Sequence, residues 1–163
     1  LFNQQHNKEM TNTLLLKTTK DDLSRAVDYT YYLTQNWEES KEGVMLNFYD
    51  SAVSLNASVK SLNFMYYLNN SPVALNLLSN LIEQYSFDLK NSIIDALNND
   101  GSISYTKDSI ANIHHDLSLL YEFLDTHNTQ LIYISDQNII DDWRIVVNQL
   151  KYQKVKERYI EMP

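Results

Sequence analysis

"SIANIHHDLSLLYEFLDTHN", residues 109–128, decides the fold because its apolar side chains recur at alternating steps of three and four. Steps of this kind place side chains on one face of an α-helix. The stretch therefore predicts an amphipathic helix that turns this face toward a protein interior. The residues of the face are Ile110, Ile113, Leu117, Leu120, Leu124 and, at its end, His127.

The remainder of the chain contains few residues that break helices. Its 163 residues include two glycines and two prolines, whereas average usage would give about 20 of the two types together. Tight β-hairpins need Gly, Asn-Gly and Pro, so a β-rich fold is disfavoured. Because a chain of this length forms one core, we predict an all-α fold in which residues 1–163 form a single antiparallel bundle of four to five long helices.

Apolar periodicity divides the chain into five predicted helical segments. The first three span about residues 5–41, 44–69 and 72–98, the fourth contains the opening stretch, and the fifth begins at Ser135. Residues 131–134, "LIYI", fit either a helix or an extended segment. The face predicted for the first segment consists of Leu16, Lys20, Leu23, Val27, Tyr31 and Thr34. The face predicted for the fifth consists of Ile139, Trp143, Val146 and Leu150.

The predicted ends of these helices rest on a few residues with special backbone preferences. The first helix is expected to end before Gly43. Ser71 is expected to cap the third helix and Pro72 to occupy its first turn, where a missing N–H costs nothing. Gly101 is expected to end the third helix in a left-handed conformation.

Charge argues against nucleic acid as a partner. The formal net charge is −8, and binding to phosphates needs a basic face. The basic terminal stretch "KYQKVKER", residues 151–158, is interpreted as a solvated helix end whose cations complement the negative pole of the helix dipole. We therefore predict that the chain does not bind nucleic acid.

Several classes of chemistry lack their motifs. The chain has no cysteine, so disulfides, thiolate nucleophiles and zinc fingers are excluded. The two glycines are isolated, which excludes phosphate-binding loops, dinucleotide fingerprints and the nucleophile elbow. We predict a protein that is not an enzyme and that holds no cofactor.

The histidines and paired acids do not form a metal site by their spacing. His114 and His115 are neighbours and point in different directions, His114 flanking the core and His115 facing outward. A helical metal site needs ligands three or four residues apart, and no histidine has such a partner in the known patterns. Adjacent acids such as Asp141 and Asp142 diverge in the same way. The sequence thus predicts no metal site and no common point at which its polar side chains meet.

Tyrosine supplies the candidate binding surface. The stretches "DYTYYLTQNW" and "NFMYYL" place tyrosines on several faces of their helices, so that some hydroxyl groups reach water or a partner. A side chain with an apolar body and a polar tip is typical of binding surfaces. The residues predicted to form a ligand or partner surface are Tyr29, Tyr32, Tyr66, Tyr67 and His114.

Three functions fit these observations. The chain begins at Leu1 rather than Met, so we expect it to be trimmed from a longer protein, and no stretch approaches the length of a membrane span. In layout alone, the predicted bundle resembles the extracytoplasmic sensor or anchor-proximal domains of bacterial membrane proteins, a resemblance that transfers no site. The favoured prediction is a non-enzymatic, membrane-anchored, extracytoplasmic domain that binds a small-molecule ligand or a protein.

Two alternatives stay open. One is a cytoplasmic helical adaptor or regulator that uses a tyrosine-rich face. The other is a metal-dependent bundle enzyme whose ligands come from scattered acids and histidines. A homodimer is compatible with each of the three.

Overall fold

The protein is all-α, as predicted, in a computed structural model that describes residues 2–37, 41–99, 104–132 and 137–160. Four long helices, a 3₁₀ turn and two shorter helices make up the described residues. In chain order they are α1 (Phe2–Gln35), α2 (Lys41–Leu68), α3 (Val73–Asn98), α4 (Lys107–His127), η1 (Asn128–Ile132), α5 (Gln137–Gln149) and α6 (Gln153–Ile160).

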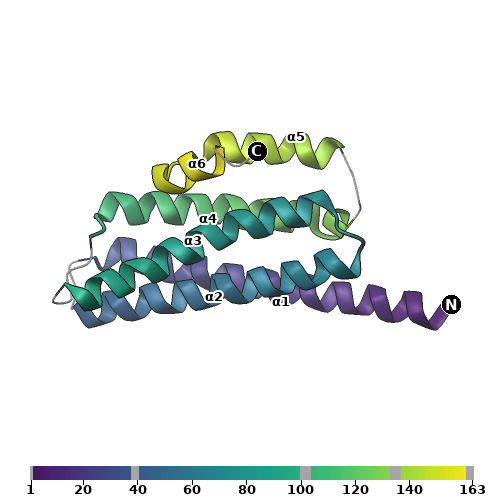
Figure 1. Ribbon diagram of the computed structural model, residues 1–163, viewed down its shortest axis with the longest axis horizontal. Coiled ribbons are helices and arrows are strands. Elements are labelled where there is room, and N and C mark those ends of the chain that lie inside the picture. The colour runs from purple at the N-terminus through teal and green to yellow at the C-terminus, as the bar shows by residue number, and fades with distance from the viewer. Residues whose placement is uncertain (1, 38–40, 100–103, 133–136, 161–163) are drawn as a thin grey trace.

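The four long helices form an antiparallel bundle in which α2 lies between α1 and α3, and α1 also packs against α4. Helices α3 and α4 touch each other little. Helices α5 and α6 lie across this pair and form a further layer over the bundle (Figure 1). The core is therefore closed on one side by the C-terminal helices.

Helix α4 follows the predicted pattern. Thr106 precedes it, and the Thr106 hydroxyl accepts a hydrogen bond of 3.1 Å from the backbone N–H of Ser109, which caps the first turn. Its apolar face is buried throughout, and the fully inaccessible residues of that face are Ile110, Ile113, Leu117, Leu120 and Leu124.

Helix α1 buries a face that overlaps the predicted one only in part, at Leu16 and Leu23. Tyr31 is 54% exposed, whereas Leu33 is buried. Because α1 packs against both α2 and α4, its interior side is wide and includes small and polar residues. Thr19 and Thr30 lie there because their hydroxyl groups bond to backbone carbonyls one turn earlier. The buried residues of α1 are Asn12, Leu16, Thr19, Asp22, Leu23, Ala26, Thr30 and Leu33.

The predicted helix ends need correction. Gly43 does not separate the first two helices, since it lies inside the first turn of α2. Ser71 has a φ of 63° and does not cap α3; Pro72 is the N-cap residue, and no side chain bonds there. Gly101 lies outside the described residues.

The C-terminal region forms two helices instead of the single fifth helix that we predicted. Helix α5 begins at Gln137 and ends at Gln149, and α6 starts after a break that contains two buried side chains, Leu150 and Tyr152. Of the ambiguous residues 131–134, Leu131 and Ile132 belong to the 3₁₀ turn η1, and the other two lie outside the described residues.

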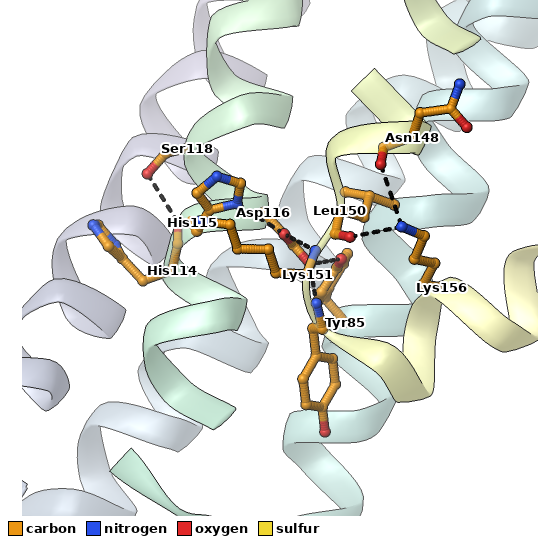
Figure 2. Close-up of polar contacts among 10 residues, drawn as sticks. Tyr85, His114, His115, Asp116, Ser118, Asn148, Leu150, Lys151 and Lys156 are labelled. Atoms are coloured by element: carbon orange, nitrogen blue, oxygen red, sulfur yellow. Dashed lines mark hydrogen bonds and ion pairs between the residues drawn. The ribbon is translucent and has the colours of Figure 1, made fainter. Parts of the chain in front are cut away.

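The basic terminal stretch is only partly solvated. The ammonium group of Lys156 donates to the carbonyl of Leu150 at 3.0 Å and to that of Asn148 at 3.3 Å, near the end of α5 (Figure 2). A cation at this place satisfies carbonyls that the helix leaves unpaired. A cation therefore does pair with a helix end, as predicted, but Lys156 belongs to α6 and the carbonyls that it meets lie at the end of α5 and in the break that follows it.

Candidate functional site

Helix α2 carries apolar side chains on two faces. Its buried face packs against α1 and α3, whereas a second set of large apolar residues is exposed. At 100° per residue, this second set falls within about 60° of the helix circumference. Its members are Leu46, Tyr49, Val53, Phe64 and Tyr67. A surface helix normally has one apolar face, so the second face is the feature of α2 that its packing leaves unexplained.

Helix α3 adds three exposed apolar residues to the same side of the molecule. Phe87, Ile94 and Leu97 are separated by steps of seven and three, which keeps them on one face of the helix. They belong to the half of α3 that lies beside the beginning of α2, because the two helices run antiparallel.

One hydrogen bond sets the register between these two helices. The hydroxyl of Ser86 donates to the carbonyl of Ala52 at 3.0 Å, so these residues lie at the same level. A groove of about 440 Å³ opens there between the helices. Its walls are Tyr49, Ala52, Val53, Asn56, Glu83, Ser86, Phe87, Lys90 and Ile93.

The groove and the exposed residues around it form one surface, which we call the α2–α3 patch. Its six members are between 45% and 68% exposed, and exposed apolar side chains that lie close together mark interaction sites. The α2–α3 patch consists of Leu46, Tyr49, Val53, Phe87, Ile94 and Leu97.

The predicted tyrosine surface is divided between the two ends of the bundle. The side chains of Asn12 and Asn69 bond to each other at 3.0 and 2.8 Å, which places the end of α2 beside the beginning of α1. Tyr66 and Tyr67 lie near this contact, with their rings 5.3 Å apart. Tyr29 and Tyr32 lie further along α1, roughly 20 Å away along the helix axis. The two pairs therefore cannot share one small ligand.

His114 connects α4 to α1. Its Nδ1 lies 3.2 Å from the carbonyl of Val27 and 3.3 Å from the hydroxyl of Thr30, and its ring lies 5.5 Å from that of Tyr31. Burial lowers the pKa of His114 below its usual value, although the bond to the Val27 carbonyl opposes the shift. The neutral imidazole thus acts as a bridge between two helices.

Several polar groups meet at Asp116, an arrangement that we did not predict from the sequence. Its fully buried carboxylate accepts hydrogen bonds of 2.8 Å from the Tyr85 hydroxyl and from the backbone N–H groups of Lys151 and Tyr152. The Nδ1 of His115 lies 3.1 Å from the same carboxylate, so this histidine does not simply face outward. Figure 2 shows Asp116 reaching from α4 toward the break between α5 and α6.

The prediction that polar side chains have no common focus is therefore wrong at this point. The Asp116 carboxylate satisfies backbone groups that the break leaves without helical partners, which explains why the break can be buried. Burial raises the pKa of the Tyr85 hydroxyl, and the neighbouring carboxylate adds to the shift, so this hydroxyl remains a donor. The sequence contained a signal for the burial of Asp116, because residue 116 lies between Ile113 and Leu120 along the buried side of α4, but no signal for the groups that meet it.

A second acid, Asp88, fastens α6 to α3. Its carboxylate accepts hydrogen bonds from the hydroxyls of Tyr105 and Tyr152 and a 2.9 Å ion pair from the Arg158 guanidinium. Burial raises the pKa of Asp88, but these hydrogen bonds and the charges of Lys154 and Arg158 outweigh it, and the pKa is lowered overall. The sequence had given no reason to pair residues 70 positions apart.

His127 joins α4 to α5. It is buried against the ring of Phe123, with 4.5 Å between the ring centroids, and its Nε2 lies 3.4 Å from the Asp142 carboxylate. Within residues 2–37, 41–99, 104–132 and 137–160, no three metal-ligating side chains gather at one point. Both acid clusters, together with His114, His115 and His127, have structural contacts, and the α2–α3 patch is the candidate functional site.

Comparison with known proteins adds no further assignment: the chain matches no protein-family model, no curated protein and no solved structure. In the part of the chain that the structure describes, none of the helices has the length and apolarity needed to cross a membrane.

Proposed function

We propose that this chain is a non-enzymatic helical binding module, and that the α2–α3 patch is the surface that holds its partner. The observation that carries the proposal is that three exposed apolar side chains from two helices line one groove, and that three more are exposed further along the same two helices. Aromatic anchors in a partly enclosed groove are the usual centre of a protein interface, and Tyr49 and Phe87 occupy that place here.

The shape of the patch favours a protein partner over a small molecule. Small-molecule pockets enclose most of the surface of their ligand. The α2–α3 patch instead follows two antiparallel helices that lie side by side, with anchors at intervals of three, four and seven residues. A groove between helices with this spacing is suited to an amphipathic helix, which inserts its own apolar face.

A photo-crosslinking amino acid at position 87 tests the proposal. We expect a covalent adduct with one partner protein when the variant is expressed in the cells from which the chain derives. Ile145 on α5 is the matched control, because it is 55% exposed and lies outside the patch. Adducts that are equally frequent from positions 87 and 145, or their complete absence from position 87, would refute the proposal.

The predicted location outside the cytoplasm remains part of the proposal, with a sensor-like role near a membrane, and a cytoplasmic adaptor would use the same patch. Fractionation of source cells with an antibody against the chain separates the two. Recovery in the soluble cytoplasmic fraction supports the adaptor, and recovery in the membrane or extracytoplasmic fraction supports the sensor-like domain.

The metal-dependent enzyme stays a prediction that no described cluster of side chains favours. Metal analysis of the protein purified without chelator tests it. A stoichiometric metal, or a rise in melting temperature on addition of a divalent ion, would support this alternative.

A further inference from the structure

Three charged residues lie beside the apolar side chains of the α2–α3 patch. Glu42 lies in the first turn of α2, one turn before Leu46 and outside the groove, and Glu83 is one of the residues that line the groove. Lys90 lines the groove between them. Along the two helices, an acid, a base and a second acid therefore follow one another beside the apolar side chains of the patch.

The helix register gives the spacing of these three charges. The bond from Ser86 to Ala52 sets these two residues level, so Lys90 lies about six residues of α2 beyond the level of Glu42. Glu83 lies seven residues from Lys90 along α3. At 1.5 Å per residue, the two acids are about 20 Å apart along the helix axes, with the base near the midpoint.

We propose that the partner presents an amphipathic helix whose charges mirror this order, with a base, then an acid seven residues later, then a base after a further seven. Seven residues make almost two helical turns, so all three charges lie on one face of the partner. Apolar residues three or four positions from each charge would then meet Tyr49, Val53 and Phe87. This inference rests on the proposed function and specifies the partner of the same patch.

The charge of the whole chain favours such a partner over a second copy. The formal net charge of −8 repels another copy at long range and attracts a helix with a net positive face. The three charged side chains, those of Glu42, Glu83 and Lys90, are exposed. Ion pairs between them and a partner would therefore determine how the partner helix aligns and which partner binds more than they would add affinity.

Two synthetic 22-residue helical peptides test the inference. They share length and apolar positions, and one carries base, acid and base at the three positions where the other carries acid, base and acid. We expect fluorescence anisotropy at low salt to show about tenfold tighter binding of the first peptide, with the difference shrinking as salt is added. The variant with Glu42→Lys, Glu83→Lys and Lys90→Glu should prefer the second peptide, and its circular dichroism should match that of the unmodified chain.

Equal affinities for the two peptides, or a preference that the charge-reversed variant leaves unchanged, would overturn the inference. An adduct from position 87 would in that case leave the proposed function intact. A concentration-dependent dimer that Phe87→Glu abolishes would also overturn it, because the patch would then be occupied by a second copy. Failure of both peptides to bind, together with no adduct from position 87, would overturn the inference and the proposed function at once.

Discussion

Replacing Asp116 with Asn tests the role of the buried carboxylate in holding the C-terminal helices. The carboxylate accepts three hydrogen bonds of 2.8 Å, one from the Tyr85 hydroxyl and two from the N–H groups of Lys151 and Tyr152. An amide has the same shape but turns one acceptor into a donor. The Tyr85 hydroxyl can rotate to accept from the amide, but the backbone N–H groups cannot.

At least one of the two backbone N–H groups therefore loses its acceptor, which costs about 1–3 kcal/mol, and the two remaining bonds lose their charge assistance, which together costs about 1 kcal/mol. We expect the free energy of unfolding of Asp116→Asn to fall by about 2–4 kcal/mol.

Urea unfolding at neutral pH, followed by far-UV circular dichroism, measures this change. With a slope of about 2 kcal/mol per molar urea, the midpoint should fall by about 1–2 M. Asp95→Asn is the matched control, because it removes the same charge from an exposed position near the end of α3. Its free energy of unfolding should stay within about 0.5 kcal/mol of that of the unmodified chain. A loss at Asp116 no larger than that of the control would refute the assigned role.

Three further outcomes are expected. The pKa of Asp88 lies below its ordinary 3.8 in the folded protein, so the ionised carboxylate contributes fully to stability above pH 3.8. This contribution is lost as the pH falls below 3.8. The stability of Asp88→Asn should therefore fall less steeply with pH in this range than that of the unmodified chain. The pKa of His114 in the folded protein lies below its ordinary 6.5, so the imidazole is protonated more readily in the unfolded chain. Stability therefore falls as the pH drops below 6.5. This fall should be smaller in His114→Gln when thermal unfolding is compared at about pH 7 and pH 5. Tyr159→Phe should lower the free energy of unfolding by about 1–2 kcal/mol in urea titrations, because the Trp143 indole N–H loses the hydroxyl that it meets at 2.8 Å.

Sequence periodicity predicted the helices best where the apolar side chains were large. In α4 the face consists of Ile110, Ile113, Leu117, Leu120 and Leu124, and each of these five residues is buried. In α1 the interior includes Thr19, Thr30 and Ala26, residue types that fit either environment, so that the periodicity gave a face that is only partly buried and placed Tyr31 inside. The prediction failed because the width of a buried face depends on how many neighbours the helix has.

The candidate site was only partly accessible to sequence reasoning. Tyr67 is 77% exposed, as expected for a tyrosine with a solvated or bound hydroxyl, but the α2–α3 patch around Tyr49 and Phe87 was not predicted. Both residues sit in sequences that are apolar on more than one face. Whether such a residue is covered depends on the presence of a neighbouring helix, which local sequence does not report.

The sequence by itself determined that this protein is built from helices, because helix formation depends on the scarcity of chain breakers and on side-chain period, both of which are local properties. Only the tertiary structure decided how the helices are offset along one another. That offset follows from the packing of side chains across interfaces, and it brings Asp116 to the break at residues 150–152 and sets Lys90 between Glu42 and Glu83. The contacts of Asp116 and the order of the three charges beside the patch depend on this offset, so neither could be predicted from the sequence.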